Sequence, residues 1–208
     1  MLACWSVKGG SGTTVFASVL ALGLADHHGA ANIVDLSGDV PAVLGMAEPA
    51  NRGVRDWLAG VHRDPQDFVR LRLAATSRLG VVPAGSDAPF DDHSLIDLAN
   101  VVADHTVVDF GTLQPPELLR PLIRTEWLVL RPCYLALRRA AKLPRRPHGV
   151  VVVREPGRAL TSRDIQSVVG APVVAEVSVT DEVARSVDAG LLATRLPRLL
   201  ADEVGPLL

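Results

Sequence analysis

This chain has few of the residues that usually mark a metal site, a disulfide framework or an aromatic core. Phe, Trp and Tyr make up only 4% of its 208 residues, so its core must rest on Val, Leu and Ala. Its two cysteines, Cys4 and Cys133, lie in apolar runs. Such a pattern does not predict disulfides and favours a reducing cytoplasm. The six histidines and two cysteines also lack metal-ligand spacing, which argues against a structural zinc site.

The chain also has no large excess of positive or negative charge and no long apolar run. The net charge is −2 at pH 7, so bulk electrostatics favours neither nucleic acid nor a membrane as partner. No run reaches the roughly 20 apolar residues that span a bilayer. The first ten residues lack a basic start followed by an apolar run, so no signal peptide is predicted. We therefore expect a cytoplasmic protein without a transmembrane segment.

What the chain does contain is a regular alternation of predicted strands and helices. The strands are predicted at 2–7, 31–36, 78–85, 105–111, 126–132, 148–155 and 171–178. The helices are predicted at 13–29, 54–61, within 65–74, 91–105, from 115 onward, and near 134–142, 161–169, 180–190 and 195–204; residues 37–53 are expected to be irregular. Strands that are almost wholly Val, Ile and Leu indicate an α/β fold, a mostly parallel sheet with helices on both faces. Without a linker or repeat, residues 1–208 are predicted to form a single domain.

The segment "KGGSGTT" (residues 8–14), here called the glycine loop, lies between the first strand and the first helix. Glycines let backbone N–H groups turn inward, and a helix N-terminus adds partial positive charge, so this arrangement predicts a phosphate site. The common P-loop reads G-x-x-x-x-G-K-[ST]. In that alignment Val7 stands at the first glycine and Thr13 at the lysine, so the common pattern fails twice.

The glycine loop resembles the deviant Walker A loop of the ParA/MinD family, K-G-G-x-G-K-[ST], at six of seven positions. Lys8 matches the signature lysine, which in that family reaches the partner subunit's nucleotide in an ATP-dependent sandwich dimer. Many members lack the first glycine, so Val7 is no departure, whereas Thr13 is. The missing lysine and the short length resemble the pilus- and flagellum-positioning members (the CpaE/TadZ-like group), some of which have degenerate loops.

Further segments resemble the same family. "VDLSGDVPAVLG" (34–45) is similar to the D-x-D segment, with Asp35 at its first acid, Ser37 at its second, and Asp39 nearby but out of register. "HTVVDFGT" (105–112) resembles the Walker B strand, where Asp109 would hold magnesium through water. "EWLVLRPCYLALRRA" (126–140) is similar to a strand followed by a proline and a helix, and "VAEVSVTDEVARSVDAG" (174–190) to the late segment that borders the base pocket.

The resemblance implies an ATP- and Mg²⁺-dependent homodimer that positions or partitions a chromosome, a pilus or the division machinery through an unnamed protein partner. The implied phosphate cradle is Lys8, Gly9, Gly10, Ser11, Gly12, Thr13 and Thr14; the implied metal set is Thr14, Asp35 and Asp109; and the implied catalytic residues are Lys8 and Asp35. Thr13 and Ser37 replace two groups that the family uses in hydrolysis. The resemblance therefore implies weak or absent ATPase activity, with a non-hydrolysing scaffold on the same fold as the alternative.

Two other interpretations remain open at this point. Gly10-x-Gly12 after the first strand, with Asp35 closing the second, partly fits a dinucleotide-dependent oxidoreductase, although Val15 stands where that fingerprint has its third glycine. The basic run in residues 137–149 is either a solvated helix end or a patch for non-specific DNA contact through phosphates. Its members are Arg138, Arg139, Lys142, Arg145 and Arg146.

Overall fold

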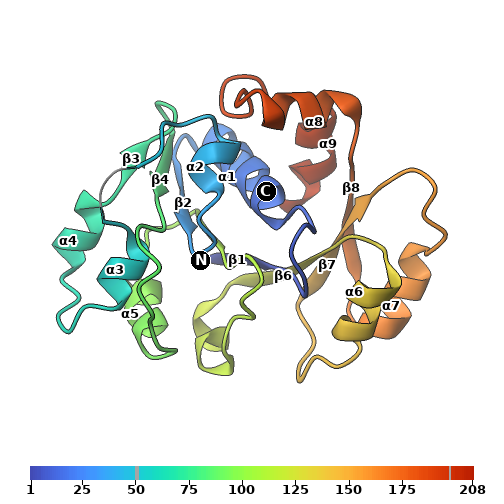
Figure 1. Ribbon diagram of the computed structural model, residues 1–208, viewed down its shortest axis with the longest axis horizontal. Coiled ribbons are helices and arrows are strands. Elements are labelled where there is room, and N and C mark those ends of the chain that lie inside the picture. The colour runs from blue at the N-terminus through green and yellow to red at the C-terminus, as the bar shows by residue number, and fades with distance from the viewer. Residues whose placement is uncertain (50–51, 197) are drawn as a thin grey trace.

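The computed structural model describes residues 1–49, 52–196 and 198–208, and Figure 1 shows a sheet between two layers of helices. Within the described residues, eight strands form one sheet in the order β3-β4-β2-β5-β1-β6-β7-β8. They are β1 (Leu2–Trp5), β2 (Ala31–Asp35), β3 (Leu73–Ala74), β4 (Leu79–Val82), β5 (Thr106–Asp109), β6 (Thr125–Leu130), β7 (Gly149–Arg154) and β8 (Val173–Ser178). Neighbouring strands are parallel except β3 and β4, which are antiparallel. The predicted α/β fold is confirmed.

The helices are divided between the two faces of this sheet, as Figure 1 shows. One face carries α1 (Thr13–His28), α2 (Val40–Val43), α8 (Asp181–Asp188), α9 (Arg198–Val204) and the short 3₁₀ helix η2 (Gly205–Leu207). The other face carries α3 (Val54–Leu58), α4 (Pro65–Arg70), α5 (Ser94–Val101), the 3₁₀ helix η1 (Glu117–Leu122), α6 (Tyr134–Ala140) and α7 (Ser162–Val169). No helix in the described ranges is long and apolar enough to cross a membrane.

Each central strand is buried on both of its faces, which explains its unbroken apolar sequence. In β1, Leu2 and Cys4 belong to the core on the α1 side, whereas Ala3 and Trp5 belong to the opposite core. Successive side chains of a strand point to opposite faces, so both faces need apolar residues. This double burial fixes the strand ends from which the loops of the site emerge.

Helix α1 lies directly behind the glycine loop and is buried along most of its length. Ten of its 16 residues are buried, which matches its nearly all-round apolar sequence. Gly12 before the helix and Gly29 after it both have positive φ, at 85° and 84°. Glycine adopts this left-handed conformation without the steric cost that other residues incur. The two glycines therefore set where α1 begins and ends, and its N-terminus faces the carboxyl edge of the sheet.

The structure differs from the sequence prediction in three segments. The helix within 65–74 ends at Arg70, because the chain continues into β3, a two-residue strand at the sheet edge. The helix predicted from 115 is the 3₁₀ helix η1 with Pro121 inside it, a residue that cannot donate a backbone hydrogen bond. The stretch 37–53 contains the short helix α2. Residues 50, 51 and 197, which fall in predicted segments, lie outside the described residues.

Candidate functional site

A cleft of about 660 Å³ opens at the carboxyl ends of β1, β2 and β5. Ligands of parallel α/β sheets commonly bind at this edge, where neighbouring chain connections run to opposite sides. One wall is the glycine loop with the start of α1. The other is formed by three groups of residues: Leu36, Ser37, Asp39, Ala42 and Val43 after β2; Phe110 to Leu113 after β5; and Arg55 of α3 with Phe90.

The glycine loop is held in shape by short-range hydrogen bonds. The hydroxyls of Ser6 and Ser11 both donate to the Lys8 carbonyl oxygen, at 2.9 and 2.8 Å. The backbone N–H of Ser6 donates to the Gly111 carbonyl at 2.8 Å, which ties the loop to the end of β5. Gly10 and Gly12 have φ values of 72° and 85°. These contacts and conformations fix the backbone of the glycine loop; its predicted role as a phosphate cradle stays a prediction.

The start of α1 presents the predicted hydroxyl residues to the cleft. Thr13 is the first helical residue, is 6% exposed and lines the cleft together with Thr14. The first N–H groups of a helix have no intrahelical carbonyl partner, so they are available to an anion. Thr13 adds no charge to them. Backbone dipoles are thus the main attraction that this wall offers to phosphate.

Lys8 points away from this cradle. Its ammonium group donates to the Gly9 carbonyl at 3.0 Å, an exposed bond within the loop itself. Among the described residues that line the cleft, Lys8 is absent. Its side chain is therefore on the outer surface of the loop, where a group from outside the chain could meet it.

Side chains from three separate segments meet beside the cleft and are here called the carboxylate cluster (Thr14, Asp35, Ser37 and Asp109); of these, Thr14 and Ser37 line the cleft itself. The sheet register pairs Asp35 with Asp109 at the ends of neighbouring strands β2 and β5. The Ser37 hydroxyl lies between them, 2.9 Å from Asp35 Oδ1 and 2.8 Å from Asp109 Oδ2. It also lies 3.3 Å from Thr14 Oγ1, which links the cluster to α1.

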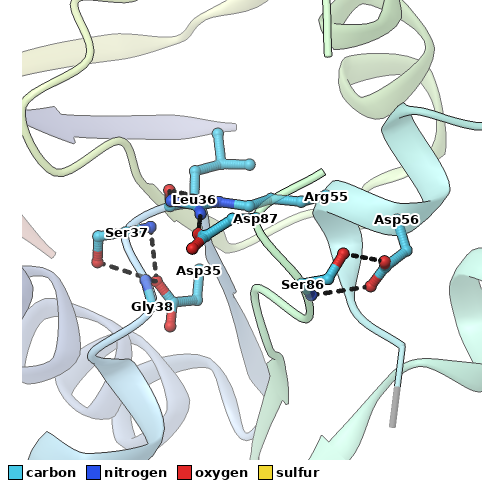
Figure 2. A network of polar contacts seen from close by, with 8 residues as sticks. All are labelled: Asp35, Leu36, Ser37, Gly38, Arg55, Asp56, Ser86 and Asp87. Carbon is cyan, nitrogen blue, oxygen red and sulfur yellow. Dashed lines mark hydrogen bonds and ion pairs between the residues drawn. The ribbon is translucent and has the colours of Figure 1, made fainter. Parts of the chain in front are cut away.

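Asp35 uses its carboxylate to hold the turn that follows β2, as Figure 2 shows for part of this network. Its Oδ1 accepts the backbone N–H groups of Ser37 and Gly38, at 2.8 and 2.7 Å. Its Oδ2 accepts the N–H of Val40 at 3.0 Å, where α2 begins. The side chain is fully buried. These contacts suit a residue that positions Ser37 and α2, and they leave few lone pairs of Asp35 free for a ligand.

Asp109 is fully buried, and burial raises the pKa of its carboxyl group from 3.8 to about 6. Hydrogen bonds, including that from the Gly111 N–H at 2.9 Å, act in the opposite direction, and the nearby Asp35 raises the pKa further. Loss of water favours the neutral form of a carboxyl group. A cation placed beside Asp109 would favour the ionised form and so lower this pKa.

Sequence reasoning did not identify Arg55, although it lines the cleft. Arg55 lies in α3, and its Nε and Nη2 donate to the Leu36 carbonyl at 3.2 and 2.7 Å. Nothing in the spacing "VRDWLAGV" connects this arginine to the glycine loop. The contact arises because the start of α3 docks on the segment after β4, where the Arg55 N–H donates to the Ala84 carbonyl at 3.0 Å.

A second cavity of about 150 Å³ lies on the other side of the loop. It shares Gly12 and Val15 with the first cleft, and it is bordered by residues 177–179 at the end of β8 and by α8. Its remaining lining is largely apolar, from Phe16, Val19, Val153, Val183, Val187, Leu200 and Val204. The segment that sequence reasoning placed beside a base pocket therefore borders a cavity next to the loop; its role stays a prediction.

The predicted basic patch needs one correction. Arg145 is not a surface cation: its guanidinium pairs with Glu126, whose side chain is fully buried, and with Glu117 at 3.0 Å. A buried carboxylate is costly unless a cation and hydrogen bonds compensate it, so Arg145 has a structural task. Arg138, Arg139, Lys142 and Arg146 are exposed. Of these, Arg139 donates to the Val7 carbonyl at 3.0 Å and so supports the glycine loop from outside.

Comparison with known proteins identifies the fold. No protein-family model and no curated protein matches this sequence. Among solved structures, the chain is similar to a ParA family ATPase from Chlorobium tepidum (TM-score 0.76, 20% identity, covering 98% of this chain and 94% of the other). It is also similar to the septum site-determining protein MinD of Pyrococcus horikoshii, complexed with Mg-ADP (TM-score 0.77, 18% identity, covering 99% of this chain and 93% of the other). It is similar as well to the MinC:MinD cell division protein complex of Aquifex aeolicus, with a TM-score of 0.75 and 16% identity over 99% of this chain and 94% of the other. The chain has the fold of the ParA and MinD ATPases.

Proposed function

We propose that this chain is a nucleotide-dependent switch of the ParA/MinD type, in which bound ATP and Mg²⁺ hold two copies of the chain together. The observation that carries the proposal is the carboxylate cluster beneath the glycine loop. Thr14 Oγ1, Ser37 Oγ and the Asp109 carboxylate lie within one hydrogen-bonded group at the N-terminus of α1. Mg²⁺ prefers such oxygen ligands and is commonly held through one or two carboxylates and the phosphates of a nucleotide.

The residues of the cleft fit these ligands. The loop amides would bind the phosphates, Thr14 would hold Mg²⁺ directly, and Asp109 would hold it through water. When bound, Mg²⁺ neutralises negative charge on the phosphates. Asp35 would act through the turn that it holds, and Lys8, on the outer surface of the loop, would reach the nucleotide of the second copy.

The same residues favour binding over turnover. Thr13 removes a charge-assisted contact worth roughly 1.5–3 kcal/mol, or about one to two decades of affinity, while the backbone cradle remains. Hydrolysis also needs an oriented water and stabilised charge at the terminal phosphate. Ser37 stands in place of the second acid, and Asp39 lines the cleft at the start of α2. We therefore propose slow or absent ATP hydrolysis, with nucleotide occupancy setting the oligomeric state.

Two alternatives are weaker on specific grounds. A constitutive scaffold would not need the ordered loop and the oxygen cluster to face one cleft. A dinucleotide-dependent oxidoreductase would need Asp35 to bind a ribose hydroxyl, but its carboxylate accepts three backbone N–H groups and the Ser37 hydroxyl. The fold likeness to MinD complexed with Mg-ADP also supports the switch.

On this proposal the protein is cytoplasmic, one domain of residues 1–208, and its dimer recruits a protein partner of a partitioning or positioning machine. The likeness to MinD in a complex with MinC supports a partner of that kind. A non-specific contact with DNA would fall on the exposed cations Arg138, Arg139, Lys142 and Arg146.

The test is a titration of purified protein with ATP and with ADP by calorimetry, with and without Mg²⁺, while light scattering follows the molar mass. We expect Mg²⁺-dependent ATP binding with a shift to dimer. In Lys8→Ala the shift to dimer should be lost, and in Thr14→Ala the Mg²⁺ dependence should be lost. Lys142→Ala is the matched control, since Lys142 is exposed and is the only other lysine in the sequence. No heat of binding up to millimolar nucleotide, with unchanged mass, would make the protein a scaffold.

A further inference from the structure

The cleft contains one cationic side chain among its described lining residues, and it does not come from the glycine loop. That residue is Arg55 of α3. The loop itself offers Thr13 at the lysine position, and the Lys8 ammonium group is directed to the Gly9 carbonyl. The positive charge available to an anion in this cleft is therefore on the wall opposite the loop.

The guanidinium of Arg55 is fixed at that wall by the backbone of Leu36, as Figure 2 shows. Two of its nitrogens, Nε and Nη2, donate to the Leu36 carbonyl oxygen. Leu36 is the neighbour of Ser37, whose hydroxyl contacts Asp109 and lies 3.3 Å from Thr14. Arg55 is therefore anchored one residue away from the carboxylate cluster.

The remaining partner of Arg55 is one that an anion could replace. Nη1 pairs with Asp87 Oδ1 at 2.5 Å, but the Asp87 side chain is 98% exposed, whereas that of Arg55 is 21% exposed. Ion pairs with such an exposed group contribute little to stability. A guanidinium has five N–H donors, so donors on both terminal nitrogens remain after these contacts. Planar bidentate binding of phosphate is the geometry for which arginine is suited.

The arrangement of the two cavities indicates which part of a nucleotide would reach Arg55. The apolar cavity beside β8 and α8 and the polar cleft beside β2 and β5 meet at Gly12 and Val15. An apolar pocket suits a base, and Thr14 and Asp109 would hold the metal that accompanies the phosphates on the side of the polar cleft. Arg55 lies on that same side, because it bonds to Leu36, the chain neighbour of Ser37, and Ser37 contacts Asp109.

We propose that Arg55 supplies the charge that the glycine loop lacks, by leaving Asp87 and binding the terminal phosphate of a nucleoside triphosphate held in the cleft. This inference rests on the proposed function, because it needs a nucleotide bound by the loop. It assigns to Arg55 the discrimination between triphosphate and diphosphate, and it makes Asp87 an internal competitor for the same guanidinium.

The experiment compares dissociation constants for Mg-ATP and Mg-ADP by calorimetry. Arg55→Ala should weaken ATP binding roughly 10- to 100-fold, as loss of one charge-assisted contact does, and ADP binding less than about 3-fold. Arg55→Lys keeps the positive charge but cannot bind phosphate through two N–H groups at once, so its dissociation constant for Mg-ATP should lie between those of the wild type and Arg55→Ala. Asp87→Ala should tighten ATP binding a few-fold by removing the competitor. Arg70→Ala is the control, since Arg70 is exposed on α4 and, among the residues that the structure describes, pairs only with the exposed Asp67.

Arg55 also joins α3 to Leu36, so each variant is first checked for an unchanged thermal unfolding midpoint. Asp87→Ala keeps Arg55 in place and decides the question if Arg55→Ala does not fold. Equal weakening of ATP and ADP in Arg55→Ala, or unchanged ATP affinity in Asp87→Ala, would overturn the assignment of Arg55 alone. Failure of the wild-type protein to bind either nucleotide would instead overturn the proposed function and this inference with it.

Discussion

The glycine loop and the carboxylate cluster adjoin one cleft and meet at Thr14, but they are built differently. The loop is shaped by the φ values of its glycines and by bonds to its own carbonyls, such as that from Ser11 to Lys8. The carboxylate cluster is made of side chains from α1, β5 and the turn after β2, which meet only because the sheet brings them together. The glycine loop is thus shaped by its backbone, and the carboxylate cluster by its side chains.

This difference predicts that the glycine loop and the carboxylate cluster respond differently to substitution. A backbone cradle keeps its N–H groups whatever residue stands at position 13, so on the proposed function Thr13 should weaken phosphate binding without removing the site. A catalytic side chain has no backbone group that could replace it. Ser37 stands at the position of the second acid in the D-x-D segment, so the negative charge of that acid is absent here. Binding and hydrolysis can therefore be lost separately, which is what the proposed function requires.

The strongest effect is expected at Asp109. Its pKa is raised from 3.8 to about 6 by burial, so the folded state binds this proton more tightly than the unfolded chain does. The stabilisation is therefore complete below pH 4 and is lost as the pH rises through 6. The difference corresponds to about 3 kcal/mol at pH 8. Asp109→Asn, which carries no charge, should thus raise the free energy of unfolding by up to about 3 kcal/mol at pH 8 and change it little at pH 4.

Urea unfolding of both proteins between pH 4 and pH 8 measures this difference directly. The control is Asp26→Asn, whose exposed carboxylate should contribute less than about 0.5 kcal/mol at either pH. A constant difference between wild type and Asp109→Asn over the whole range would mean that this carboxyl group is not stabilised in its neutral form. The carboxylate cluster would then not be poised for a cation in the way described above.

Within the glycine loop, the largest effect should come from a substitution of Gly12. Gly12 precedes α1 with φ of 85°, and a Cβ there would lie 3.6 Å from Val153. A β-branched residue is strained in this conformation, so Gly12→Val should lower the free energy of unfolding by about 2 kcal/mol and abolish nucleotide binding. Gly9→Ala is the matched control, since Gly9 does not need a positive φ and has open space. Equal losses in both variants would show that glycine number, and not loop conformation, shapes this wall.

The sequence allowed the glycine loop and the two acid-tipped strands to be located, and physical reasons explain why. The loop is local, so its glycines and hydroxyls appear within seven consecutive residues. Asp35 and Asp109 end parallel strands, and the carboxyl ends of neighbouring parallel strands meet at one edge. Long apolar runs separated by turns likewise predicted a buried parallel sheet.

Residues whose role depends on docking between distant segments could not be found in this way. Arg55 reaches the cleft only because α3 packs on the segment after β4. Arg145 looked like part of a charge run, but its partner Glu126 belongs to β6. The predicted catalytic role of Asp35 stays a prediction; the sequence pattern did not show that its carboxylate accepts the backbone N–H groups of Ser37, Gly38 and Val40. Packing between distant segments decided the contacts of Arg55 and Arg145, and the local path of the turn after β2 decided those of Asp35.

The smallest effects are expected at two serines, Ser37 in the carboxylate cluster and Ser11 in the glycine loop. Ser37→Ala removes a hydroxyl that bonds Asp109, and Ser11→Ala removes one that donates to the Lys8 carbonyl at 2.8 Å. Each should cost about 1 kcal/mol of unfolding free energy at pH 8, the usual net value of a hydrogen bond. The bond of Ser37 is stronger to an ionised carboxylate than to a neutral one, so its loss should shrink as the pH falls below 6. The loss at Ser11 should not change with pH, because its acceptor is a backbone carbonyl. The same urea titrations measure both variants, and a pH-independent loss at Ser37 would mean that its hydroxyl does not serve the charge of Asp109.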